Sequence, residues 1–176
     1  KRQNEIYSKD YMIEDEQINA NLVSFCRELQ SFFSVGGKEG MLVLTDGHLV
    51  FLRRTERMKN WWKATVTRQV VTLHTNSNVM ITHDGYDVED LLTDLEEKSK
   101  YASVVSFNNI LEIGYEEKQW GNLLKMIVVE DGEEKEYQYS IVRDWVQYPL
   151  KDPTSYLKVN WKPLIEFIES RRTVKE

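Results

Sequence analysis

Two Asp-Gly dipeptides, each set between strand-like segments, constrain the fold of this chain most strongly. Asp46-Gly47 separates the two apolar runs of M-L-V-L-T-D-G-H-L-V-F-L. Asp131-Gly132 lies in M-I-V-V-E-D-G-E-E-K-E-Y-Q-Y-S-I, where polar and apolar residues alternate after the turn. Asp-Gly is favoured in the type I′ turn of a two-residue hairpin, because both central residues need positive φ there. The sequence therefore predicts two antiparallel hairpins, one in each half of the chain.

Three segments have the three- and four-residue apolar spacing of an amphipathic helix. They are residues 15–33, residues 87–100 and the segment that follows Asn160. The spaced apolar residues of the first segment are Ile18, Leu22, Phe25, Leu29 and Phe32. In the last segment Pro163 falls in the first turn, where its missing N–H is tolerated. The sequence thus predicts an N-terminal helix, an inserted helix and a C-terminal helix.

Four further segments favour strands, namely residues 64–75, 79–82, 103–107 and 110–117, and the first strand of the second hairpin extends over 123–130. Because tight turns join most neighbours, we expect a mainly antiparallel sheet of about seven strands. The predicted fold class is α+β, a β-barrel or sandwich with a C-terminal capping helix. The predicted organisation is an arm and amphipathic helix over 1–36, packed on a domain over 37–176 that carries the helical insertion near 87–100.

The charge of the chain is distributed unevenly. The net charge is −6, whereas residues 53–68 hold six cations and one anion (+5), which leaves −11 for the rest. An acidic body argues against a nucleic-acid ligand, whose binding surface is broadly basic. No apolar run reaches the roughly 20 residues that span a bilayer, and no apolar signal segment follows the first residues. The single cysteine, Cys26, excludes an internal disulfide and a cysteine-based zinc site, so we expect a cytoplasmic protein, free or peripheral to a membrane.

Three segments, in order along the chain, carry a family resemblance: G-M-L-V-L-T-D-G-H-L-V-F, then S-F-N-N-I-L-E-I-G-Y, then K-M-I-V-V-E-D-G-E-E-K-E-Y-Q-Y-S-I with the helix around Trp161. Together they resemble the pleckstrin-homology-like (PH-like) superfold, and within it the GRAM and bacterial PH-like families, over roughly residues 37–172. The resemblance implies a PH-like barrel and a non-enzymatic binding or adaptor module. The predicted N-terminal helix and the insertion near 87–100 depart from the family pattern.

In that superfold, lysines and arginines on the loop between the first two strands bind anionic phospholipid headgroups; here the cations fall on the next loop. Arginine holds phosphate through a bidentate fork and lysine acts as a point charge. The candidate ligand-binding residues are Arg53, Arg54, Arg57, Lys59, Lys63 and Arg68. The adjacent Trp61 and Trp62 are candidate membrane or partner contacts, because tryptophan prefers the membrane interface. The alternative is that one tryptophan packs on the sheet and the cations protect a strand edge from aggregation.

No other pattern favours catalysis or a metal. The stretch D-G-Y-D-V-E-D lacks the spacing of a calcium loop and is explained by helix capping, with Asp87 as N-cap. His48, His74 and His83 lack zinc-binding spacing, and the chain has no nucleophile elbow. We therefore predict no cofactor and no enzyme activity. Two functions stay open: binding of anionic phospholipid headgroups at a membrane, and protein interaction or oligomerisation through the N-terminal helix or an open sheet edge.

Overall fold

The computed structural model describes residues 13–28, 38–98, 102–119, 121–141 and 157–172. The strands are β1 (Ile18–Glu28), β2 (Lys38–Thr45), β3 (His48–Arg53), β4 (Ser103–Ser106), β5 (Ile110–Lys118), β6 (Gly121–Glu130) and β7 (Glu133–Ser140). The helices are α2 (Lys59–Thr75), α3 (Val88–Lys98) and α4 (Lys162–Arg171), with 3-10 turns η2 (Ile13–Asp15) and η4 (Phe107–Asn109). The α+β class and the count of about seven strands are confirmed.

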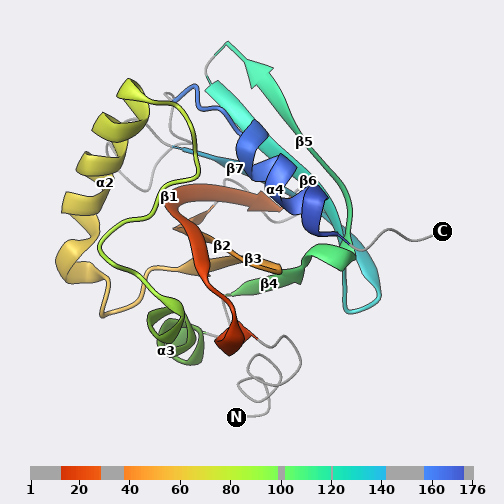
Figure 1. The fold of residues 1–176 in the computed structure, drawn as a ribbon, viewed down its shortest axis with the longest axis horizontal. Helices are drawn as coiled ribbons and strands as arrows, with labels where there is room; N and C mark the ends of the chain where they lie inside the picture. The colour runs from red at the N-terminus through yellow and green to blue at the C-terminus, as the bar shows by residue number, and fades with distance from the viewer. Residues whose placement is uncertain (1–12, 29–37, 99–101, 120, 142–156, 173–176) are drawn as a thin grey trace.

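The seven strands form one antiparallel sheet in the order β4-β3-β2-β1-β7-β6-β5 (Figure 1). Each half is built from neighbours in sequence, and β1 joins the halves by pairing with both β2 and β7. The end strands β4 and β5 do not pair with each other in the described part of the chain. The sheet is therefore open, and the prediction of a closed barrel is wrong.

Both predicted hairpins are confirmed, but their turns differ. Asp131 and Gly132 have φ values of 54° and 78°, as a type I′ turn requires. Neither Asp46 nor Gly47 has positive φ, so the first turn is not of this type. That turn is held by Glu16 instead, whose carboxylate accepts a hydrogen bond from the Gly47 N–H at 2.9 Å. Contacts from a distant segment thus replace the local preference of Asp-Gly.

The N-terminal segment forms β1 rather than the predicted helix. β1 is the central strand of the sheet, and every side chain from Ala20 to Cys26 is buried. A strand covered on both faces reads as a nearly continuous apolar run, without the alternation of a half-exposed strand. Residues at helical spacing in such a run are apolar as well, which explains why the helix prediction is wrong. Residues 1–12, which make up most of the predicted arm, lie outside the described residues.

Helix α2 occupies the stretch that was predicted to be a loop and a strand. Its β-branched residues, such as Val66 and Val70, favour strands by local propensity. Its buried residues are Trp62, Thr65, Gln69 and Leu73, which are three, four and four positions apart and so share one helix face. Tertiary burial of that face overrides the local propensity. The predicted strand 79–82 is also absent: an isolated bridge from Asn78 to Asn160 is the nearest sheet-like pairing in that described segment.

The other helices lie where the sequence predicts them. The N-terminus of α3 is capped reciprocally: the Asp90 N–H donates to the Asp87 carboxylate at 2.9 Å, and the Asp87 N–H donates to the Asp90 carboxylate at 3.1 Å. In α4, Pro163 occupies the first turn as expected. The segment between Ile141 and α4 lies mostly outside the described residues.

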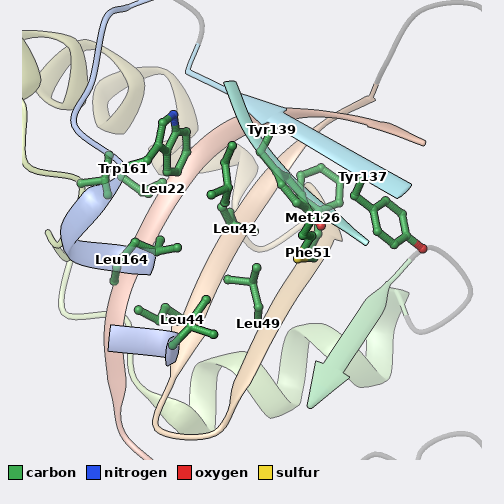
Figure 2. Close-up of a cluster of buried hydrophobic side chains, with 14 of the residues drawn as sticks. Leu22, Leu42, Leu44, Leu49, Phe51, Met126, Tyr137, Tyr139, Trp161 and Leu164 are labelled. Carbon is green, nitrogen blue, oxygen red and sulfur yellow. The ribbon is translucent and has the colours of Figure 1, made fainter. Parts of the chain in front are cut away.

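Two apolar cores cover the two faces of the sheet. On one face, α4 and the segment before it pack on the sheet, and Figure 2 shows Trp161 and Leu164 over Leu22 and Leu42. On the other face, α3 and the start of α2 pack on β1 to β4, with Leu91 and Leu95 among the buried side chains. Gly40 is required in the first core, because a Cβ there would lie 2.6 Å from the Phe51 ring and 2.4 Å from a backbone oxygen.

Ser24 in β1 gives a prediction about stability. Its side chain is fully buried, and its hydroxyl has no hydrogen-bond partner among the described residues. Burying an unpaired hydroxyl costs about 1–3 kcal/mol. Ser24→Ala is therefore expected to leave the free energy of unfolding unchanged or to raise it by up to about 1 kcal/mol, as measured by urea denaturation.

The control for this prediction is Thr45→Val. The Thr45 hydroxyl is buried but paired, since it accepts a hydrogen bond from the His48 N–H at 2.9 Å. Its removal should lower stability by about 1–2 kcal/mol. A comparable loss in Ser24→Ala would contradict the assignment of an unpaired hydroxyl.

Cys26 is buried in β1, as expected for a structural cysteine, although in a strand rather than a helix. Burial raises the pKa of its thiol to about 12. Because the thiolate is the reactive form, we expect no measurable reaction with a chromogenic disulfide reagent at pH 8 in the native protein and complete reaction in urea. Rapid native reaction would show that the strand opens far more readily than its packing implies.

Candidate functional site

The basic stretch runs from the end of β3 through a turn into the first half of α2. Arg53 ends β3, Arg54 and Arg57 lie in the connection, and Lys59, Lys63 and Arg68 lie on the helix. The candidate cations therefore do not share one flexible loop. Half of them project from a regular helix, which stands at the side of the sheet in Figure 1.

Arg57 pairs with two carboxylates of α3. Its guanidinium lies 3.0 Å from the fully buried Asp94 carboxylate and 3.1 Å from Asp90. Asp94 also accepts hydrogen bonds from the Tyr86 hydroxyl at 2.7 Å and the Thr55 hydroxyl at 3.0 Å. A buried charge must be paired and hydrogen-bonded to be tolerated. Arg57 therefore stabilises the packing of α3 against the turn between β3 and α2.

Tyr86 supports the same network in its neutral form. Burial, together with the negative charge of Asp94, raises the pKa of the Tyr86 hydroxyl far above its ordinary value of 10.0. The hydroxyl stays protonated and can only donate toward Asp94. We refer to Thr55, Arg57, Tyr86, Asp90 and Asp94 as the Asp94 network.

Three more candidate cations also have partners. Lys59 pairs with Glu56 at 2.7 Å, and Arg68 pairs with Asp84. The Arg53 side chain donates a hydrogen bond to the backbone carbonyl of Glu39 at 3.0 Å. The first two pairs are exposed, where ion pairs contribute little and exchange readily with water. They compete only weakly with an anionic ligand.

The remaining cations, Arg54 and Lys63, have no carboxylate partner in the described part of the chain. The Arg54 guanidinium lies 5.8 Å from the centre of the Trp62 ring, within range of a cation–π contact. Trp62 itself is only 4% exposed, and its indole N–H donates to Glu39 at 3.3 Å. Trp61 is half-buried against the rings of Trp62 and Tyr86. The two tryptophans therefore pack on the body, with only part of Trp61 exposed.

The outward face of α2 is cationic. Its 17 residues include Lys59, Lys63 and Arg68 but no aspartate or glutamate. Val71, on the same helix, is 62% exposed. This face is the part of the basic stretch that an anionic partner can reach.

The outer edge of β5 is a second accessible surface. β5 pairs with β6 over its whole length, and no other strand in the described residues pairs with its opposite edge. Leu111 and Tyr115 in β5 are 45% and 38% exposed. Apart from Val71, they are the exposed large apolar side chains of the described residues. Nothing lies within 4 Å of a Cβ built on Gly114, so space is open over one face of the strand at that position.

The three histidines lie on different parts of the fold. His48 lies beside Asp46 in sequence, but its Nδ1 lies 3.1 Å from the Glu16 carboxylate. His74 is exposed on α2, and His83 is buried against β1. The sequence patterns did not indicate that Glu16 and Asp94 each accept several hydrogen bonds from distant segments. For Asp94 a signal was present, since it lies on the apolar stripe of α3 between Leu91 and Leu95.

The described residues bring no three histidine, cysteine or carboxylate side chains together as a metal site needs. None of the helices in those residues is long and apolar enough to cross a bilayer. No model of a known protein family matches this chain, and no curated protein matches it significantly. The two accessible surfaces, on α2 and at the outer edge of β5, are therefore the features that indicate a function.

Proposed function

We propose that this chain is a non-enzymatic binding module that takes up an extended peptide segment along the free edge of β5. The added segment forms backbone hydrogen bonds with β5, and its side chains contact Leu111 and Tyr115. Such strand addition uses main-chain hydrogen bonds for affinity and alternate side chains for specificity.

The observation that carries this proposal is the exposure of β5. Natural edge strands are usually short, covered or charged, because an open edge invites pairing with another chain. The other edge strand, β4, has four residues, whereas β5 has nine and exposes two large apolar side chains. The charges Glu112, Glu116 and Glu117 limit uncontrolled aggregation of this edge.

The C-terminal helix gives the same proposal limited support through the family resemblance. A helix at the end of the chain, packed on one face of the sheet, was expected from that resemblance. That superfold hosts peptide binders as well as lipid binders, so the fold alone does not choose between them.

The test is a selection of extended peptides from a random display library against the whole chain, followed by mapping of amide chemical shifts. We expect enriched peptides to shift the amides of residues 110–118 and to lose binding at least tenfold in the double variant Leu111→Lys, Tyr115→Lys. Val71→Lys, an apolar-to-cationic change at a still more exposed position on α2, is the control and should bind normally. Enriched peptides that shift α2 instead, or a library that yields none, would reject the proposal.

A second candidate function is binding to an anionic membrane surface through α2. The observation that favours it is the absence of acidic residues from this cationic helix, in a chain whose net charge is −6. Lysine and arginine near an anionic bilayer each contribute about 1 kcal/mol of attraction, which salt screens.

Co-sedimentation with vesicles containing phosphatidylserine or phosphoinositide tests this candidate. We expect salt-sensitive binding that Lys63→Glu weakens severalfold. Lys162→Glu, the same charge change at the start of α4, should have no such effect. Absence of binding at low salt would exclude the lipid function and leave the β5 proposal unaffected.

A further inference from the structure

β1 is paired on both sides, but by different kinds of partner along its length. On the side of β7 it pairs with that strand only from Phe25 to Glu28. Nearer the start of β1, residues 69–83 contact the same side of the strand. These residues comprise the end of α2 and the segment after it, and we call them the strap. The Asn21 N–H donates to the Ile81 carbonyl at 3.0 Å. The strap thus takes the place of a neighbouring strand.

Gln69 makes the central contact of the strap with β1. Its amide oxygen accepts from the Val23 N–H at 2.9 Å, and its amide nitrogen donates to the Val23 carbonyl at 2.8 Å. One side chain therefore satisfies both backbone groups of Val23, which would otherwise be buried and unpaired.

His83, at the end of the strap, contacts both Gln69 and Asn21 and so stabilises this arrangement. Its Nε2 lies 3.1 Å from the same Gln69 oxygen, and its backbone pairs with the Asn21 side chain. Because the Val23 N–H fixes that Gln69 atom as the oxygen, His83 Nε2 must carry the proton in the neutral ring. The second proton of an imidazolium would lie on Nδ1, which makes no hydrogen bond with the described residues and is not one of their fully buried unpaired polar atoms.

The surroundings of His83 oppose a positive charge. The ring is buried, and burial lowers its pKa below the ordinary 6.5; Asp84 acts in the opposite direction and Arg68 in the same direction. Asp84 is itself paired with Arg68. Gln69 from α2, Asn21 from β1 and Met41 from β2, which contacts Asn21, carry no charge.

We propose that protonation of His83 releases the strap from β1, so that the opening of this strand edge is acid-sensitive. Burial of the ring disfavours the imidazolium in the closed state, and the imidazolium becomes fully hydrated when the strap lifts. Since α2 carries Gln69 as well as the cationic face, the helix is freed from β1 in the same step. This device is independent of the peptide proposal at β5.

The sign of the effect follows from proton linkage. In the open state His83 binds protons with its ordinary affinity, and in the closed state it binds them more weakly. Opening is therefore favoured as the pH falls below 6.5, and the closed state is fully favoured above that value. At pH 5.5 the opening equilibrium can rise by at most about tenfold, because an open-state pKa one unit above the pH gives that factor.

Amide hydrogen exchange between pH 7.5 and pH 5.5, corrected for intrinsic rates, tests the proposal within a single strand. The Asn21 and Val23 amides bond to the strap, whereas those of Leu22 and Ser24 point toward β2, because alternate residues of a strand face opposite neighbours. We expect protection to fall severalfold at Asn21 and Val23 and to stay unchanged at Leu22 and Ser24.

The variant His83→Gln keeps a donor toward Gln69 but does not titrate, and it should abolish the pH response. His74→Gln, which changes an exposed histidine near the end of α2, should preserve it. An equal loss of protection at all four amides would mean global unfolding and would overturn the proposal. So would unchanged protection at Asn21 and Val23, or a response that persists in His83→Gln.

Discussion

Replacing Gln69 with leucine is expected to lower the free energy of unfolding by about 3–5 kcal/mol. The substitution preserves volume and apolar packing but leaves the Val23 N–H and carbonyl without partners in a buried site. Each buried backbone group left unpaired costs about 1–3 kcal/mol. Urea denaturation followed by tryptophan fluorescence measures the difference.

Thr67→Leu provides the matched control, because it introduces the same residue at an exposed position of the same helix. Its effect should stay within about 0.5 kcal/mol of the wild type. If Gln69→Leu were equally mild, the strap would be held by apolar packing rather than by its pairing with β1.

The second large effect is expected at the Asp94 network. Asp94→Ala should destabilise the protein by about 3–5 kcal/mol, because it leaves the Tyr86 and Thr55 hydroxyls unpaired in the core and removes the partner of Arg57. Glu97→Ala, on the exposed side of the same helix, should change stability by less than about 0.5 kcal/mol. Thermal and urea unfolding of both variants check the difference, and equal stabilities would show that Asp94 is not buried as described.

Because Arg57 belongs to the Asp94 network, its variants are unsuitable for tests of ligand binding. A loss of binding in an Arg57 variant would follow from the weakened fold, since Arg57 holds Asp94. Lys63 is the better choice, because it is exposed and makes no ion pair with the described residues. Assays of the basic stretch should therefore rest on Lys63 and, second, on Arg54.

The sequence predicted those elements whose local signals agree with their environment. The Asp131-Gly132 hairpin, α3 with its Asp87 cap and α4 with Pro163 each combine a pattern with a fitting terminus or turn. The predictions failed where tertiary burial acts against local preference. β1 is apolar on both faces and so resembles a helix in its spacing, and α2 is rich in β-branched residues but buries a helical face.

The candidate site was predictable in composition but not in arrangement. The cluster of cations and tryptophans is visible in the sequence, whereas the pairing of Arg57 with Asp94 joins residues far apart in the chain. The burial of Trp62 likewise depends on Glu39 in β2. The edge exposure of β5 follows from the strand order, which local patterns do not determine.

The position of β1 also sets the order in which a newly made chain can close its sheet. Its pairing with β2 is nearby in sequence, but Phe25 pairs with Ser140, so this part of the strand waits for almost the whole sheet to be synthesised. The stretch around Asn21 and Val23 waits for less, because the strap is complete at His83. The strap can therefore cover the Asn21–Val23 edge of β1 before β7 has been synthesised. Unpaired strands aggregate most readily at that stage. Variants that weaken the strap should for that reason reduce the yield of folded protein during expression, beyond what their equilibrium stability implies.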